Sequence, residues 1–94
     1  MNIDWSARAI ADLKAVRDFV ARENPEAAQE TALKIISSID ILSMFPAAGQ
    51  NGRVVGTREL VIAGTPYVIP YRLREGRIEV LRVIHSARKW PTTF

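Results

Sequence analysis

The sequence contains no cysteine and only one histidine, His85. Disulfide staples and thiolate metal sites are therefore excluded, and one imidazole alone cannot hold a metal ion. No glycine-rich phosphate loop follows a predicted strand either. We therefore expect neither a metal nor a cofactor, and the absence of cysteine fits a reducing compartment.

Long apolar runs are also missing. The first ten residues, MNIDWSARAI, do not have the basic region and apolar run of a signal peptide, and no stretch is long enough to cross a bilayer. The 94 residues are nearly half apolar, which is enough for one small core. These features predict a single domain over residues 1–94, a cytoplasmic location, and no membrane or small-molecule partner.

Positive charge is concentrated in the second half of the chain. Residues 1–46 carry five Lys/Arg and seven Asp/Glu, whereas residues 47–94 carry eight Lys/Arg and three Asp/Glu. A basic half beside a slightly acidic half favours an anionic partner on one side of the molecule. A solvated basic surface is an equally good interpretation of charge alone.

The first half has the pattern of a helical hairpin. Ser6 is a candidate N-cap for a helix that runs to about Glu23, and Asn24 followed by Pro25 ends it and caps a second helix that runs to about Met44. The predicted buried stripes have spacings of three and four residues, with Ile10 and Phe19 widening the first and Leu33 and Ile36 flanking the second. Opposite charges four residues apart predict surface pairs Arg8–Asp12 and Lys14–Asp18.

The second half has the pattern of three strands, Thr57–Ile62, Tyr67–Leu73 and Arg77–His85, separated by two turn signals. Connections this short force antiparallel pairing. Pro70 cannot donate to a ladder, so we expect a bulge or an unpaired amide there. With a possible strand at residues 2–5, this predicts an α+β fold in β-α-α-β-β-β order, with a helical hairpin packed on a small antiparallel sheet.

Several polar side chains in this half have two interpretations. Arginines on apolar strand faces suit either buried pairing, for example with Glu59 or Glu79, or an open surface that binds an anion. The loop at residues 47–56 is either a slack connection or a means of presenting Arg53 to a ligand. His85 is either structural or an acid/base group, since it alone can change protonation near neutral pH.

The ordered motifs GTREL (56–60), PYVIPYR (66–72) and IEVLRVIHSARKWP (78–91) resemble the RelE/ParE superfamily of toxins from type II toxin–antitoxin modules. The resemblance covers essentially the whole chain. It implies a compact fold in which a twisted antiparallel sheet packs on a helical hairpin, and a flexible cognate antitoxin that wraps the toxin.

The same resemblance implies one of two targets. RelE-like members cut mRNA in the ribosomal A site, and ParE-like members inhibit DNA gyrase. RNA-cutting members keep lysines at the positions of Glu59 and Val61, an arginine at the position of Val68 and an arginine matched by Arg88. A glutamate and two valines cannot stabilise phosphate charge, so this comparison favours the ParE-like branch.

The sequence therefore predicts a growth-inhibitory toxin that binds gyrase and is neutralised by its antitoxin, with Arg88, Lys89 and Trp90 as candidate target-binding residues. One alternative is a metal-independent endonuclease acting on ribosome-bound mRNA. Its candidate residues would be His85, Arg88, Arg58, Arg72 and Arg82. A second alternative is a non-toxic basic module that binds nucleic acid. Under the toxin hypothesis, the chain alone should expose an apolar patch for the antitoxin.

Overall fold

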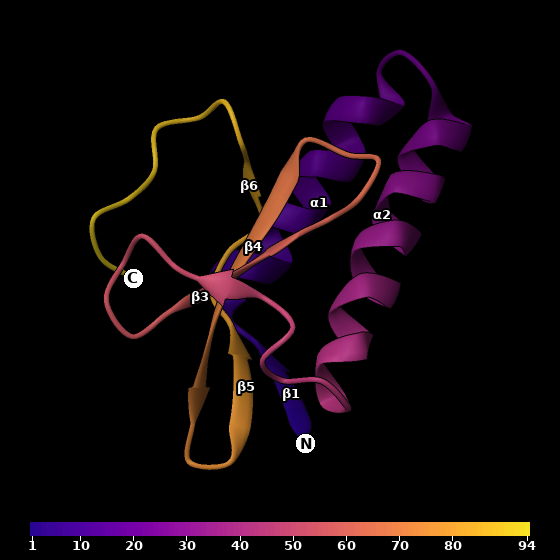
Figure 1. Cartoon of the computed structure of the whole chain (residues 1–94). Helices are drawn as coiled ribbons and strands as arrows, with labels where there is room; N and C mark the ends of the chain where they lie inside the picture. Colours follow the sequence, from indigo (N-terminus) through magenta and orange to yellow (C-terminus); the bar gives the residue numbers. More distant parts are fainter.

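The computed structural model describes all residues 1–94 and has two helices lying against one face of a six-stranded sheet (Figure 1). This is the predicted α+β arrangement. Its elements, in chain order, are β1 (Asn2–Trp5), α1 (Ala7–Ala21), α2 (Pro25–Asp40), a short 3-10 helix (Ile41–Ser43), β2 (Gln50–Asn51), β3 (Arg58–Val61), β4 (Tyr67–Arg74), β5 (Arg77–Val80) and β6 (Ile84–His85).

Local side chains fix both helix starts as the sequence predicts. The Ser6 hydroxyl accepts a hydrogen bond from Ala9 N at 3.0 Å, and Asn24 Oδ1 accepts one from Ala27 N at 3.1 Å. Each bond satisfies an amide that the first turn leaves free. Both helices end earlier than predicted, α1 at Ala21 and α2 at Asp40, where the backbone tightens into the 3-10 turn. Neither helix is long and apolar enough to span a bilayer.

The sheet is mixed, with strand order β1-β5-β4-β3-β2 and β6 pairing with β4. Strand β1 is parallel to β5, with Ile3 opposite Ile78, while every other pair is antiparallel. The expectation of an antiparallel sheet therefore describes β2 to β6 and misses the parallel edge. The crossover through both helices makes a parallel pair possible, because such pairs need a long connection.

The prediction of one continuous strand over Arg77–His85 is wrong. The structure has two strands there, β5 and β6, with a break between them. In β4, Tyr71 lies opposite Val80 and Val68 lies opposite Ile84, so residues 69–70 face the three residues 81–83. One extra residue on that side makes a bulge opposite Pro70, whose missing amide had predicted an irregularity. The bulge lies in the neighbouring strand rather than in β4 itself, and it ends the expected side-chain alternation after Val80.

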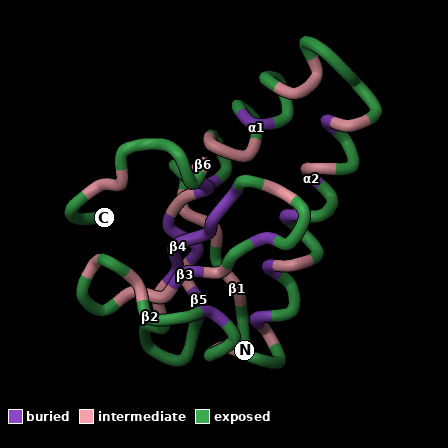
Figure 2. The backbone as a smooth tube through the Cα atoms, turned by 45° about the horizontal axis from the view of Figure 1, so that its top comes forward, coloured by how far each residue is buried: buried purple, intermediate pink, exposed green.

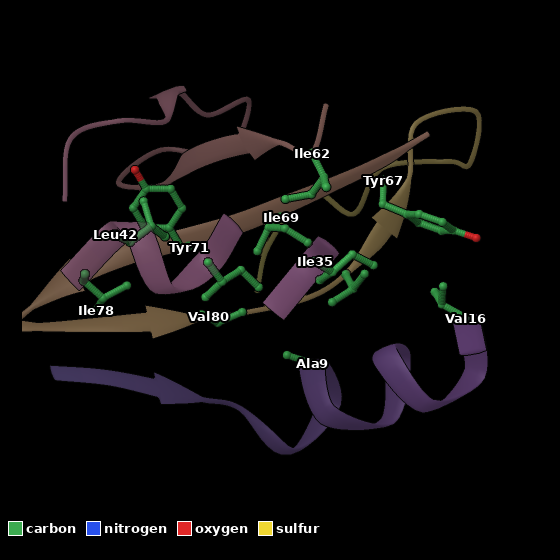
Figure 3. Close-up of a cluster of buried hydrophobic side chains, with 12 residues drawn as sticks. Ala9, Val16, Ile35, Leu42, Ile62, Tyr67, Ile69, Tyr71, Ile78 and Val80 are labelled. Atoms are coloured by element: carbon green, nitrogen blue, oxygen red, sulfur yellow. The ribbon is translucent and has the colours of Figure 1, made fainter. Parts of the chain in front are cut away.

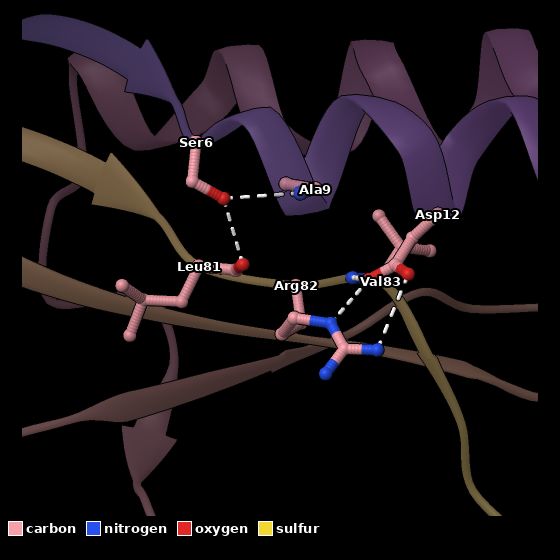
Figure 4. A network of polar contacts seen from close by, with 6 residues as sticks. All are labelled: Ser6, Ala9, Asp12, Leu81, Arg82 and Val83. Atoms are coloured by element: carbon pink, nitrogen blue, oxygen red, sulfur yellow. Dashed lines mark hydrogen bonds and ion pairs between the residues drawn. The ribbon is translucent and has the colours of Figure 1, made fainter. Parts of the chain in front are cut away.

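Helix α1 binds the polar groups of this break (Figure 4). The Ser6 hydroxyl donates to Leu81 O at 2.8 Å. The Asp12 carboxylate accepts from Val83 N at 3.0 Å and from Arg82 Nε and Nη2 at 2.6 and 3.2 Å. Backbone groups that leave the ladder are thus satisfied by side chains, as buried polar groups require. The predicted surface pair Arg8–Asp12 is not formed, because Asp12 is engaged with Arg82; Lys14–Asp18 is not formed either.

The core lies between the helices and the sheet (Figures 2 and 3). Tyr71 is fully buried there, and its hydroxyl donates to Pro46 O at 2.8 Å and accepts from Gly49 N at 2.9 Å. Ala28 and Ala32 are buried, as the close approach of the helices requires. Ile10 and Phe19 do not widen the core stripe, because both are more than half exposed.

Candidate target-binding surface

The predicted site residues His85, Arg88, Lys89 and Trp90 lie where the chain leaves the sheet after β6. The backbone turns sharply at this point, with Ser86 N donating to Pro66 O at 2.7 Å and Arg88 N donating to His85 O at 2.9 Å. Arg88 and Lys89 are exposed, and neither forms an ion pair. The turn thus carries two cations without a counter-ion within the chain.

Strand pairing adds a residue that was not singled out in the sequence, Tyr67. It lies opposite His85 in the β4–β6 register, and the two rings meet edge to face with centroids 5.5 Å apart. Burial raises the pKa of Tyr67, although the positive charge of Arg88 acts in the opposite direction. The phenol therefore keeps its proton at neutral pH. Counting the hairpin register from the turn at residues 75–76 places Tyr67 opposite Ile84, and the bulge moves its partner by one residue to His85.

The imidazole of His85 has a defined tautomer. Its Nδ1 accepts a hydrogen bond from Ala87 N at 3.1 Å, which leaves the proton of the neutral ring on Nε2. A general base accepts a proton through a lone pair on the nitrogen that faces the substrate. In this tautomer Nδ1 is already hydrogen-bonded and Nε2 is a donor, so neither nitrogen of His85 offers that lone pair.

The other candidate arginines of a nuclease are held elsewhere. Arg72 pairs with Glu79 at 2.7 Å, and Arg82 pairs with Asp12 at 2.6 Å. The prediction that strand arginines pair with neighbouring carboxylates is thereby confirmed for Arg72. Arg58 instead donates to Asn51 Oδ1 and to the backbone oxygen of Ala47, at 3.3 and 3.4 Å. None of these three side chains is hydrogen-bonded to His85.

Arg53 and Trp90 form a contact that joins the loop before β3 to the C-terminal tail. The Arg53 guanidinium lies 3.8 Å from the centre of the Trp90 ring, and it pairs with Glu59 at 3.2 Å. The Glu59 side chain is 3 % exposed and also accepts from Arg53 N at 2.7 Å. The loop at residues 47–56 is therefore more than a slack connection, since Arg53 neutralises a buried carboxylate. Arg53 and Glu59 are six residues apart in the sequence, but no sequence signal identifies Trp90 as a partner.

Because Trp90 stacks against Arg53, it is tied to the loop and is less available to a target than Arg88 and Lys89. Its ring is half-buried and holds the tail over the loop, while Arg88 and Lys89 remain free. Figure 1 shows the tail, in yellow, arching from β6 toward the loops beside β3, on the side of the sheet away from the helices. A shallow open hollow of about 430 Å³ lies beside the tail and is lined by Arg82, Lys89, Trp90, Pro91, Thr92 and Thr93.

The arrangement as a whole offers hydrogen-bond donors and positive charge. No group of three or more His, Asp or Glu side chains is placed to hold a metal ion. The site is therefore suited to binding an anionic surface.

Comparisons with known proteins agree with these features. A family model described as the ParE toxin of type II toxin–antitoxin systems, parDE, matches residues 3–90. A protein designated toxin Y4kP of Sinorhizobium fredii is 38% identical over 90 residues, which cover 96% of this chain and 93% of the relative. Toxin RelE2 of Caulobacter vibrioides is 39% identical over 87 residues, covering 93% and 97%.

A solved structure is similar as well. A chain of the chromosomal ParDE TA system from P. aeruginosa superimposes with a TM-score of 0.82 at 30% identity, covering 90% of this chain and 95% of the other. The agreement in fold extends over nearly the whole of both chains.

Proposed function

Because this chain belongs to the ParE toxin family of type II toxin–antitoxin systems, we propose that it stops growth by binding DNA gyrase and that a cognate antitoxin neutralises it. The choice of gyrase rests on one observation, which is that candidate arginines are already paired with carboxylates of the chain. Two of the arginines that could replace the missing cations of an RNA-cutting relative, Arg72 and Arg82, already have carboxylate partners. They are poorly placed to stabilise a cleavage transition state.

The positions that hold cations in RNA-cutting relatives support the same choice. Glu59 is buried and paired with Arg53, Val68 is buried, and Val61 is exposed on β3. The tautomer of His85 adds to this, since its free nitrogen carries a proton and cannot accept one. A toxin that acts by binding needs none of these groups to do chemistry.

A purified supercoiling assay tests the proposal. We expect the protein to block supercoiling by gyrase and to leave mRNA intact in a coupled translation reaction. Arg88→Ala should raise the concentration needed for half-inhibition about tenfold, because an exposed interface arginine is a frequent anchor. Arg74→Ala removes the same charge from the opposite end of β4 and should stay close to the wild type.

The alternative, ribosome-dependent mRNA cleavage, is supported by the name of one relative, toxin RelE2. It predicts the reverse pattern in the same two assays: cleaved mRNA, normal supercoiling, and loss of cleavage in His85→Ala. A protein without effect in either assay would contradict both toxin mechanisms and leave the non-toxic nucleic-acid-binding module.

We infer that the antitoxin binds the outer side of the helical hairpin. Large apolar side chains stand exposed there, and the structure thus has the apolar surface that a wrapped partner needs. Leu33 and Ile36 border a groove between the helices whose lining includes Ala21, Ala28 and Ala32. An amphipathic segment of the antitoxin fits such a groove, and acidic residues beyond it would reach the basic half of the chain.

Leu33→Glu should weaken antitoxin binding by at least tenfold, because the new carboxylate would be buried without a partner in the complex. Isothermal titration calorimetry with the purified antitoxin measures this. Val55→Glu is the matched control, since Val55 is 98% exposed in the loop before β3 and lies away from the hairpin. Equal losses in the two variants would place the antitoxin elsewhere.

A further inference from the structure

Three groups at the β6 end of the sheet present donors to the same region. Tyr67 and His85 are paired across β4 and β6, with their rings in edge-to-face contact. Arg88 follows in the turn that starts at His85, where Arg88 N donates to His85 O at 2.9 Å, and its positive charge lowers the pKa of Tyr67 against the effect of burial. Tyr67 and His85, 18 positions apart in the sequence, are thus brought together by the strand register.

Each of the three groups can donate a hydrogen bond. The Tyr67 hydroxyl keeps its proton, since burial raises its pKa. The free Nε2 of His85 carries a proton because Nδ1 is occupied by Ala87 N. Arg88 has no carboxylate partner and guanidinium groups donate only.

The chain segments that form this end of the sheet contain no acidic side chain. Residues 60–71 carry no charged side chain, and residues 83–94 contain neither Asp nor Glu. The four ion pairs of the structure use other arginines, which are Arg53, Arg72, Arg77 and Arg82. Arg88 forms none of these pairs, so its charge is available to an anion from outside the chain.

We propose that Tyr67, His85 and Arg88 form a binding site for one phosphate of a nucleic-acid backbone. Further donors follow Arg88 along the tail, where a hollow is lined by Arg82, Lys89, Trp90, Pro91, Thr92 and Thr93. A row of donors and cations suits the repeated phosphates of a polynucleotide better than a single carboxylate of a protein. Duplex DNA is the favoured ligand, since a gyrase inhibitor meets gyrase together with its DNA. That preference rests on the proposed function, whereas the phosphate site itself does not.

NMR of the purified protein without gyrase tests this site directly. His85 is the only histidine of the chain, so its imidazole proton signals are unambiguous. We expect these signals to shift on titration with a short DNA duplex, and less with single-stranded RNA. Inorganic phosphate should move them only at much higher concentration, because it lacks neighbouring phosphates for the tail.

Affinity for the same duplex, measured by fluorescence anisotropy at several salt concentrations, gives the matched comparison. Arg88→Ala should weaken binding about tenfold and reduce the slope of log K against log salt by about 1. Tyr67→Phe keeps the buried ring and removes only the donor, so it should weaken binding less, by about threefold. Arg74→Ala should change the affinity least, because it lies at the far end of β4.

Equal losses in Arg88→Ala and Arg74→Ala would overturn the proposal, since they would indicate attraction by net charge alone. Displacement of the DNA by polyglutamate as readily as by a second duplex would also overturn it, because the site would then prefer carboxylates. Inhibition of supercoiling together with no DNA binding would reject the phosphate site and leave the gyrase proposal standing.

Discussion

Replacing Asp12 with alanine should lower the free energy of unfolding by about 3 kcal/mol, because one carboxylate holds the break between β5 and β6. The change removes hydrogen bonds from Val83 N, Arg82 Nε and Arg82 Nη2. It also leaves the Arg82 guanidinium, whose side chain is 19% exposed, without its counter-charge. Urea denaturation followed by circular dichroism measures the loss.

Asp18→Ala is the matched control for this variant, since Asp18 lies exposed on the same helix and forms no ion pair. Its effect should stay within about 0.5 kcal/mol of the wild type. Asp12→Asn should fall between the two, because an amide oxygen can still accept from Val83 N but carries no charge. Similar stabilities of Asp12→Ala and Asp18→Ala would mean that α1 does not hold the break.

Gly49→Ala should cost more than about 3 kcal/mol, because there is no room for a methyl group at this position. A Cβ there would lie 2.6 Å from Tyr71 Cε1, 2.7 Å from its hydroxyl oxygen and 2.8 Å from Glu59 O. Tyr71 is fully buried and cannot move aside without breaking its bonds to Pro46 O and Gly49 N. The same denaturation experiment measures this variant.

The comparison for Gly49 is Gly56→Ala, where the cost has a different origin. Nothing lies within 4 Å of a Cβ at Gly56, but its φ of +81° disfavours any side chain. That backbone strain should cost about 1 kcal/mol. A Gly49 variant no less stable than the Gly56 variant would show that the loop after α2 shifts to relieve the contact.

The helical hairpin could be predicted from the sequence because its signals are local. Ser6 and Asn24 each cap a helix through an amide three residues further on, so the sequence alone contains both partners. Periodicity did not predict which residues at the margin of the apolar stripe are buried. Phe19 extends the apolar pattern of its helix, yet it remains exposed.

The parallel edge of the sheet and the break in it could not be predicted, because both depend on contacts far apart in the chain. Asp12 has Arg8 four residues before it, and nothing local indicates that Arg82, 70 residues away, binds it instead. In the same way, the four residues of β1 contain no information that selects β5 as a parallel neighbour. Tertiary packing determines both the Asp12–Arg82 pair and the pairing of β1 with β5.

The candidate site was predicted in part. His85, Arg88 and Lys89 are neighbours in sequence, so their proximity was certain, whereas Tyr67 joins them only through the strand register. Trp90 is predicted as a target-binding residue, and its stacking against Arg53 depends on how the loop before β3 meets the C-terminal tail. Distances between loops are the least predictable feature of a sequence of this length.

The long-range contacts of β1 and α1 also set the order in which the chain can fold. Ser6 and Leu81 are 75 residues apart, and the Asp4–Arg77 pair spans 73. Most of the polypeptide must therefore have left the ribosome before the first strand finds its partner. Closing such loops costs entropy before any contact repays it, so folding should take on the order of milliseconds or longer rather than microseconds. The toxin should acquire its native shape only after residues 77–81 have left the ribosome.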